Sequence, residues 1–470
     1  MPLNDVNPGA TRSIPKSATQ SLIVSAIVLV TALLMHPQIS VTDSDAYNYI
    51  QGAYSFQAGH GYRNLNGDAL NVEPPAYSIL LAGFRSPLRA AIAINYISLG
   101  LAAGLVYLLA ENAGWSSLAS AGLALVLGVG FLRNLAVFAK PDILNYAIFL
   151  LGARCVADDS GRLRTLGGCL WALLTPLKLV SVVFVPAMLA SDYLLLTERR
   201  PLSFARYAII VVIWASAVAG ILAFNYLTIG AMLVPVINAS LPHKLVSGIG
   251  EFGYFFFRGF LADWYGSIRR WEAYVPFCIV LIIAVICLST LRQSRGGRRY
   301  LYLGGAIFGL TWLLLIVSHF DTDPRIVGYG LLVMLLAMRP ISRAERYWLA
   351  YACGTALLAL ANSFTTNSLG ANDPRYARLG REIASVSLPR AEIVSNSDHL
   401  LDVQARVPTR PVHRLADVPA GALLMRVNLQ SFDAITVMTW PIDEPPTDWT
   451  VIATWPDATL YRKPAVEPRS

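Results

Sequence analysis

Charged residues are scarce in this chain, because Asp, Glu, Lys and Arg make up only 14% of its 470 residues while hydrophobic residues make up 55%. The mean hydropathy is +0.52. Soluble domains contain about 25% charged residues, so this composition argues against a soluble globular protein. It also excludes a disordered chain, which would be poor in apolar residues. Only five cysteines are present, too few for a secreted disulfide scaffold. A polytopic membrane protein remains.

Apolar stretches of about 20 residues with charged flanks predict membrane-spanning helices. The stretch 167–196 is too long for one crossing and contains Pro176, so it predicts two short helices around Lys178. Together with the other stretches this gives eleven crossings within residues 1–362. The other stretches are 18–36, 91–110, 117–134, 142–156, 207–228, 274–291, 301–318, 326–338 and 347–362.

Lysine and arginine predict the orientation, because cytoplasmic loops carry an excess of them. With the N-terminus inside, the cytoplasmic stretches hold 15 of the 26 Lys and Arg residues that precede residue 363. Those stretches are 1–20, 111–116, 154–165, 197–206, 292–300 and 339–346. The first apolar segment is followed by no small-residue cleavage site, so it is interpreted as an anchor. Eleven crossings then place the C-terminal part outside the membrane.

The C-terminal part, residues 363–470, has 11 basic and 12 acidic residues, so the net charge of +8 comes from the membrane part. No nucleic-acid partner is expected. Segments 391–396 and 433–440 and the hairpin-like 450–463 have the composition of strands, and 397–407 that of a short helix. The predicted fold is therefore an all-α polytopic membrane protein with a small C-terminal α/β domain on the outer side.

The first outer loop, residues 37–77, is the most informative segment. Residues 44–57 predict an amphipathic helix with acidic residues at its start, the sequence GHG (59–61) would end it, and NLNGD (64–68) predicts a turn. Acidic residues at such a helix start also serve as caps and interact favourably with the helix dipole, so Asp43 and Asp45 alone do not indicate a site.

The order of residues in this loop resembles the first outer loop of GT-C glycosyltransferases, in particular bacterial protein O-mannosyltransferases and the aminoarabinose transferases of lipid A. That family shows an acidic residue, an aromatic four positions on, a small residue eight on, a G-x-G after the helix and a Pro-Pro step. The spacing fits Asp45 better than Asp43. The matching residues here are Asp45, Tyr49, Ala53, Phe56, Gly59, Gly61, Tyr62, Pro74 and Pro75.

Three more segments look similar to the family. Residues 136–151 resemble its second outer loop, with Asp142 as the acidic residue before a helix. Residues 319–336 resemble the helix that often begins R-Y-x-x-P in relatives; Arg325 is present, but the Tyr and Pro are not. Residues 391–415 resemble the small C-terminal domain. The resemblance implies a GT-C-like transmembrane domain over 1–362.

The resemblance implies an inverting enzyme that transfers a sugar from a polyprenyl-phosphate donor to an acceptor hydroxyl. The reaction would occur on the periplasmic face of a bacterial inner membrane, and the acceptor could be a glycan, a lipid or a protein. A base must take the hydroxyl proton and positive charge must stabilise the leaving phosphate. Asp45 is the predicted base, with Asp142 as a second catalytic carboxylate. The predicted phosphate or substrate contacts are Arg63, Lys140, Lys178, Arg325, Tyr49, His60 and Glu73.

Simpler roles stay open for these residues, since Lys178 could extend to the interface and the others could merely flank helices. No cofactor is required by the pattern, but carboxylates spaced as in Asp43-x-Asp45 and Asp321-x-Asp323 could hold Mg²⁺ or Mn²⁺. In the predicted outer loop 229–273, the aromatic run 251–265 is typical of an interfacial helix.

Two other classes of function stay open. A transporter or flippase of a lipid-linked sugar would place ionisable groups deep within the helices, and the sequence shows almost none there apart from Lys178. A non-catalytic subunit of an envelope-polysaccharide assembly would explain the missing Tyr and Pro after Arg325.

Overall fold

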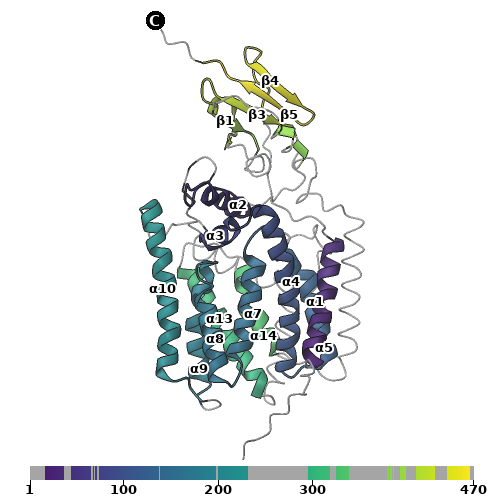
Figure 1. Ribbon diagram of the computed structural model, residues 1–470, viewed down its shortest axis with the longest axis vertical. Helices are drawn as coiled ribbons and strands as arrows, with labels where there is room; N and C mark the ends of the chain where they lie inside the picture. The colour runs from purple at the N-terminus through teal and green to yellow at the C-terminus, as the bar shows by residue number, and fades with distance from the viewer. Residues whose placement is uncertain are drawn as a thin grey trace, which may run out of the picture.

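In the computed structural model, the chain forms a bundle of helices, and a small β-sheet lies beyond one end of the bundle (Figure 1). The structure describes residues 16–35, 44–64, 67, 69–70, 73–136, 138–196, 200–230, 295–317, 324–337, 378–379, 382–383, 385, 392–397, 409–428 and 442–465. Three helical stretches of this part are long and apolar enough to cross a bilayer, namely Lys16–Leu34, Pro87–Asn112 and Phe204–Thr228.

The helices follow the predicted apolar stretches wherever the structure describes them. Their bounds are α1 Lys16–Met35, α4 Pro87–Asn112, α5 Ser117–Leu127, α7 Asp142–Val156, α8 Gly161–Ala172, α9 Phe184–Leu194, α10 Phe204–Ile229, α13 Arg295–Val317 and α14 Pro324–Leu336. A π-helical turn, Gly128–Leu132, and α6, Arg133–Ala136, extend α5. The predicted helices at 274–291 and 347–362 lie outside the described residues.

The break in the long apolar stretch occurs where the sequence predicts it. Turns at 173–177 separate α8 from the 3₁₀ turn η2, Leu179–Val183, which leads into α9. Pro176 lies in these turns, because proline has no N–H to donate and fits poorly inside a helix. Helix α8 begins at Gly161, six residues before the predicted start.

Small residues bring the helices together. Helix α1 packs on α4, α4 on α7, α7 on α8, and α13 on α14. A Cβ atom at Gly152 of α7 would lie 2.3 Å from the Trp171 ring of α8, and one at Gly167 would lie 2.7 Å from the Gly152 carbonyl. Close approach through glycine is typical of helix packing in membranes.

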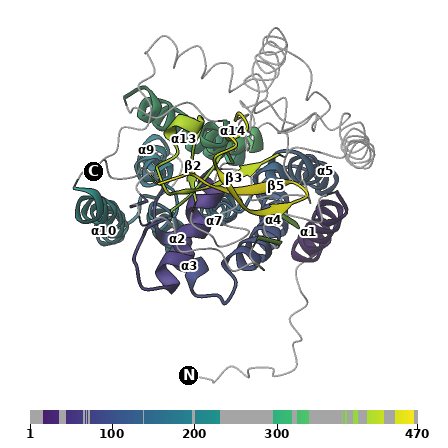
Figure 2. The same ribbon diagram turned by 90° about the horizontal axis from the view of Figure 1, so that it is seen from above.

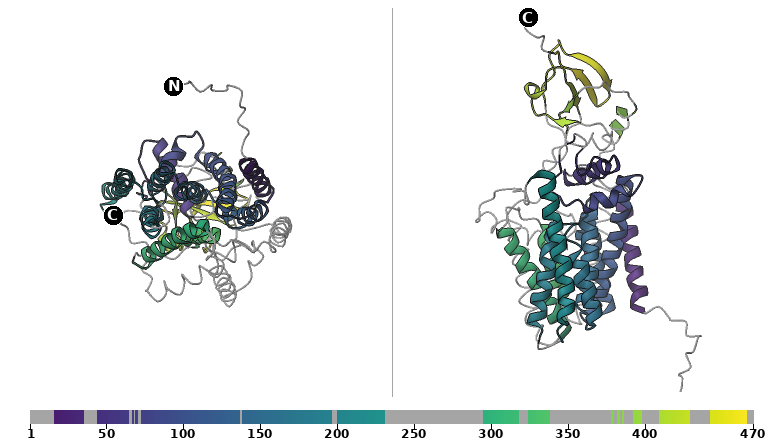
Figure 3. Two further views of the ribbon diagram at one scale, coloured as in Figure 1. Left: turned by 90° about the horizontal axis from the view of Figure 1, so that it is seen from below. Right: turned by 60° about the vertical axis from the view of Figure 1, so that its left-hand side comes forward.

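Two short helices cover the end of the bundle that faces the sheet. Helix α2, Ser44–Gln57, and α3, Ala76–Ala82, lie between the bundle and the sheet (Figures 1 and 3). Viewed from above, the strands lie over the centre of the bundle, with α10 and α1 on opposite sides (Figure 2). The predicted helix at 44–57 is thus confirmed.

The sheet has five strands in the order β2-β1-β3-β5-β4. Strand β1, Ile393–Ser395, pairs in parallel with β2, Arg410–Pro411, and with β3, Leu423–Val427. The predicted hairpin is confirmed as β4, Thr450–Trp455, and β5, Ala458–Arg462, and β5 pairs antiparallel with β3.

The central strand, β3, was not predicted from the sequence. Its residues LLMRV are buried at every position except Arg426, which is intermediate, so the run lacks the alternation that marks a half-exposed strand. The predicted strand at 433–440 and nearly all of the predicted helix at 397–407 lie outside the described residues.

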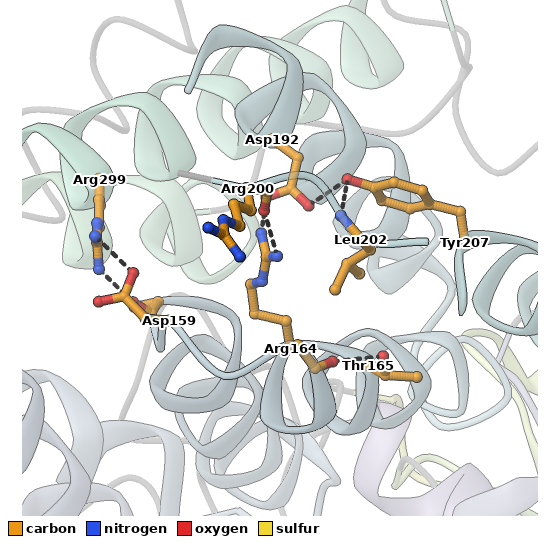
Figure 4. A network of polar contacts seen from close by, with 10 residues as sticks. Asp159, Arg164, Thr165, Asp192, Arg200, Leu202, Tyr207 and Arg299 are labelled. Atoms are coloured by element: carbon orange, nitrogen blue, oxygen red, sulfur yellow. Dashed lines mark hydrogen bonds and ion pairs between the residues drawn. The ribbon is translucent and has the colours of Figure 1, made fainter. Parts of the chain in front are cut away.

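A network of arginines and aspartates joins the helices at the far end of the bundle, where α7 ends and α8 begins (Figure 4). Arg164 of α8 and Asp192 of α9 form an ion pair at 3.6 Å, and each side chain is only 3% exposed. Arg164 also donates to the Arg200 carbonyl at 2.7 Å, and the Tyr207 hydroxyl of α10 donates to Asp192 at 2.9 Å. One buried pair therefore ties α8, α9 and α10 together.

Replacing Arg164 with Met should destabilise the protein by about 3–5 kcal/mol, because it leaves the Asp192 charge buried without its partner. Thermal unfolding of the purified protein in detergent measures this effect. The control is Arg154→Met, whose ion pair with Asp158 is 35% and 26% exposed; an exposed pair of this kind contributes about 0.5 kcal/mol. Equal, small shifts for both variants would show that the buried pair does not hold the three helices.

Candidate functional site

Three segments meet at the end of the bundle that faces the sheet, and each brings predicted site residues. They are the start of α2, the loop before α7, and the break between α8 and η2. Asp45 Oδ2 lies 2.9 Å from the Lys140 Nζ atom, and Asp142 forms an ion pair with Lys178. The structure thus arranges four of the predicted residues as two acid–base pairs.

The two pairs differ in which partner reaches the surface. In the first, the Lys140 side chain is 3% exposed and that of Asp45 is 42% exposed. In the second, Asp142 is 5% exposed and Lys178 is 19% exposed. A charge buried in a protein needs a partner of opposite charge. The more exposed partner is therefore the acid in the first pair and the lysine in the second.

Local sequence places these side chains. Asp45 lies in the first turn of α2, and Asp142 is the first residue of α7, directly after Pro141. The positive end of a helix dipole stabilises a carboxylate in both places. Lys178 has extended backbone angles between α8 and η2, so its side chain leaves the break and not the face of a helix. The Lys140 ammonium group also lies 5.7 Å from the centre of the Phe138 ring.

Both acidic helix starts carry one pattern, Asp-x-x-Asn-Tyr, in DAYNY (45–49) and in DILNY (142–146). Residues three and four positions after the aspartate lie one helical turn further along, near the same face. The sequence analysis recognised the two aspartates and Tyr49 but not the shared pattern, which was the available signal for the two asparagines.

In α2, the asparagine of this pattern reaches a third carboxyl group. Asn48 Nδ2 donates to Glu73 Oε1 at 3.0 Å, and the Tyr49 ring packs edge-on against Tyr77 of α3 with centroids 5.4 Å apart. The other carboxyl oxygen of Glu73 is buried and has no hydrogen-bond partner among the described residues. The predicted substrate residue Tyr49 therefore lies on α2, one helical turn after Asp45, and Glu73 contacts the same turn through Asn48.

Burial raises the pKa of Glu73 to about 7, although the hydrogen bond from Asn48 lowers it. The negative charge of Asp45 raises this pKa further, and the positive charge of Lys140 lowers it. Burial also raises the pKa of Tyr49, with contributions from the charges of Glu73, Asp142 and Asp45. Through Asn48, the first turns of α2 bring Glu73 next to the Asp45–Lys140 pair.

A buried asparagine on α4 fixes the loop that carries Lys140. Asn95 Nδ2 donates to the carbonyls of Phe138 and Ala136, and its Oδ1 accepts from the Tyr77 hydroxyl at 3.3 Å. The side chain is fully buried. It ties the loop before α7 to α3 and hence to the first outer loop. Asn95 was not predicted from the sequence, because a single polar residue in an apolar helix carries no pattern.

The glycines of the first outer loop have a structural explanation. Gly59 has φ of 77° and ends α2 in a Schellman motif, in which the Gly59 amide donates to the Phe56 carbonyl and the His60 amide to the Ser55 carbonyl. Gly61 also has a positive φ, 76°. After it the chain returns beneath α2, where a Cβ atom at Gly52 would lie 2.5 Å from the Tyr62 ring.

The other predicted site residues lie apart from the two pairs or outside the described residues. The Arg63 guanidinium donates to the Gly67 carbonyl at 2.7 Å and closes the predicted turn, and His60 is exposed. Arg325 is the second residue of α14, and its side chain lies outside the description. Asp43, Asp321, Asp323 and the aromatic run 251–265 lie outside it too. The described residues contain no group of three or more potential metal ligands.

Solved structures of known proteins share this architecture. No protein-family model matches the chain, and no curated protein does. ArnT from Cupriavidus metallidurans, crystallised with undecaprenyl phosphate, superposes with a TM-score of 0.58 at 14% sequence identity, over 94% of this chain and 97% of that one. The apo crystal structure of ArnT from the same organism gives a TM-score of 0.45 at 14% identity, over 95% and 98%. The first of these structures confirms the fold expected from the sequence: this chain has the fold of ArnT.

Proposed function

We propose that this protein is a membrane glycosyltransferase that moves a sugar from a polyprenyl-phosphate donor to an acceptor hydroxyl. Its fold is that of an enzyme crystallised with undecaprenyl phosphate. The observation that carries the proposal is the opposite exposure of the two ion pairs, which offers a carboxylate and an ammonium group at one end of the bundle. Glycosyl transfer with loss of a phosphate needs one group of each kind.

The proposed reaction is a direct displacement. The acceptor oxygen attacks the anomeric carbon, the bond from that carbon to the phosphate oxygen breaks, and polyprenyl phosphate leaves. The acceptor proton passes to a carboxylate, and a single displacement inverts the anomeric carbon. General-base catalysis of this kind contributes about 10²–10⁴-fold to the rate.

Asp45 is the proposed base, since its carboxylate is the more exposed of the two paired ones. Lys140 is buried beside it, so its role in the proposal is to hold and orient Asp45. Lys178 is the proposed contact of the leaving phosphate, because it carries the positive charge of the second pair and is the more exposed of the two partners. Asp142 would orient Lys178. Arg325, at the start of α14, is a second candidate for the phosphate.

The proposed orientation puts the sheet and the two ion pairs on the periplasmic side of a bacterial inner membrane. The arginines of the opposite end would then face the cytoplasm, as the excess of positive charge there favours. A donor whose lipid lies in the bilayer would present its phosphate at the level where α2 and α3 cover the bundle.

Asp45→Asn should lower the rate of transfer by about 10²–10⁴-fold, because an amide cannot accept the proton. The assay uses membranes that contain the protein, a panel of radiolabelled polyprenyl-phosphate sugars, and a cell extract as the source of acceptors. Loss of donor and gain of labelled product are both scored, and expression of folded protein is matched.

The control for this variant is Asp158→Asn, which makes the same change in a residue paired with Arg154 at the far end of the bundle. It should keep wild-type activity. Wild-type activity in Asp45→Asn would remove Asp45 as the base and turn attention to Asp142. If the wild-type protein consumes none of the donors, the glycosyltransferase proposal fails.

Glu73→Gln should change how stability depends on pH, since the pKa of Glu73 is raised from 4.5 to about 7 in the folded protein. The folded state binds this proton more tightly than the unfolded state does. The resulting stabilisation is complete below about pH 4.5 and is lost as the pH rises through about 7. The variant should gain up to ~3 kcal/mol relative to wild type between these two values. Melting temperatures in detergent across this range measure the difference, and a constant difference would show that Glu73 titrates normally.

A further inference from the structure

The start of α7 and the segment after α8 are joined by the Asp142–Lys178 ion pair and also by a hydrogen bond three residues further along each segment. The Ser181 hydroxyl donates to Asn145 Oδ1 at 3.2 Å. Asn145 follows Asp142 by three residues, and Ser181 follows Lys178 by three residues. The Ser181 amide also donates to the Lys178 carbonyl at 3.0 Å. The start of α7 and the segment that carries Lys178 are thus held together at two successive levels.

The lower contact continues to a third helix. Asn145 Nδ2 donates to the hydroxyl of Tyr329 on α14. The Tyr329 ring stacks on Tyr146 with centroids 3.9 Å apart and meets Phe149 and Phe184 edge-on. Packing therefore fixes the position of this hydroxyl, and the hydroxyl in turn fixes the Asn145 amide.

All three polar side chains of this contact are fully buried, each with 0% exposure. A buried amide that loses its acceptor must turn to find another, because an unsatisfied polar group in such a place is costly. Without the Tyr329 hydroxyl, the Asn145 amide loses one of the two partners that orient it toward Ser181. The lower of the two contacts that hold the Lys178 segment would then be weaker.

We propose that Asn145 and Tyr329 are positioning residues for Lys178, which they hold against Asp142 with its ammonium group directed to the surface of the site. This inference rests on the proposed function for its catalytic meaning, since Lys178 is there the phosphate contact. The positioning itself does not depend on which substrate the protein takes. Tyr329 acts through Asn145 and Ser181 and touches no reacting atom.

The chain offers a matched control for the loss of the Tyr329 hydroxyl. On α13, the Tyr300 hydroxyl accepts a hydrogen bond of 2.7 Å from Asn112 Nδ2, and Tyr300 is 1% exposed. The contact is again an asparagine amide on a buried tyrosine. It lies where α4 ends, at the far end of the bundle from the two ion pairs. Tyr329→Phe and Tyr300→Phe each remove the hydroxyl of a buried tyrosine that accepts from an asparagine amide, at opposite ends of the bundle.

Competitive labelling of lysine amines in the purified full-length protein tests the positioning. Peptide mass spectrometry gives the labelling rate of Lys178 relative to Lys463 of the outer domain. A net hydrogen bond corresponds to about a fivefold effect, so Lys178 should label about fivefold faster in Tyr329→Phe and in Ser181→Ala. Tyr300→Phe should label as wild type does. Equal Lys178 rates in all four proteins would overturn the inference, and so would an equal increase in Tyr300→Phe.

Binding of undecaprenyl phosphate separates this inference from the proposed function. If wild type binds the lipid, Tyr329→Phe should bind it several-fold more weakly, and the loss should vanish when Lys178→Met is already present. Unchanged binding in Tyr329→Phe would overturn the positioning role in recognition. If wild type does not bind the lipid, the proposed donor class is wrong, and the labelling rates alone decide the positioning.

Discussion

The site depends on the need to pair every charge that is buried in the helix bundle. Lys140 and Asp142 are almost completely covered, and each can remain charged there only because a partner from another segment reaches it. The need for a partner brings the first outer loop onto the start of α7, and the break after α8 onto the same helix start. Three segments that are far apart in the sequence therefore meet at one place. In each pair, the buried partner holds the more exposed one: Lys140 holds Asp45, and Asp142 holds Lys178.

Buried neutral side chains also hold the segments that carry the ion pairs. Asn95 holds the loop of Lys140 from below, and Asn145 holds the segment of Lys178. An asparagine suits this task because its amide both donates and accepts, so one buried side chain can join two or three segments. The ion pairs bring the charged groups together, and in the proposed site the asparagines hold the segments that carry them, as supporting residues of a functional site do.

The sequence was informative where one local feature determines the structure. Long apolar runs predicted the described helices, Pro176 the break before Lys178, and the glycines of GHG the end of α2. Asp45, Lys140, Asp142 and Lys178 could be named as candidates, but which acid meets which base could not, since that depends on how three loops fold over one helix end. Strand β3 was missed because burial on both faces removes the alternation of a strand. Tyr329 could not be found, since its contacts with Asn145 and Tyr146 depend on how α14 packs against α7.

The two ends of the bundle use the same chemistry for different purposes, and exposure distinguishes them. At the arginine-rich end, Arg164 and Asp192 are equally buried, so neither can meet a ligand, and their pairing joins three helices. At the sheet-facing end, each pair has one covered and one accessible member. A buried pair with both partners covered only stabilises the fold, whereas an unequal pair keeps one charge available in a fixed direction. The unequal burial of the pairs, more than the number of charges, is the reason for proposing that the sheet-facing end carries the chemistry.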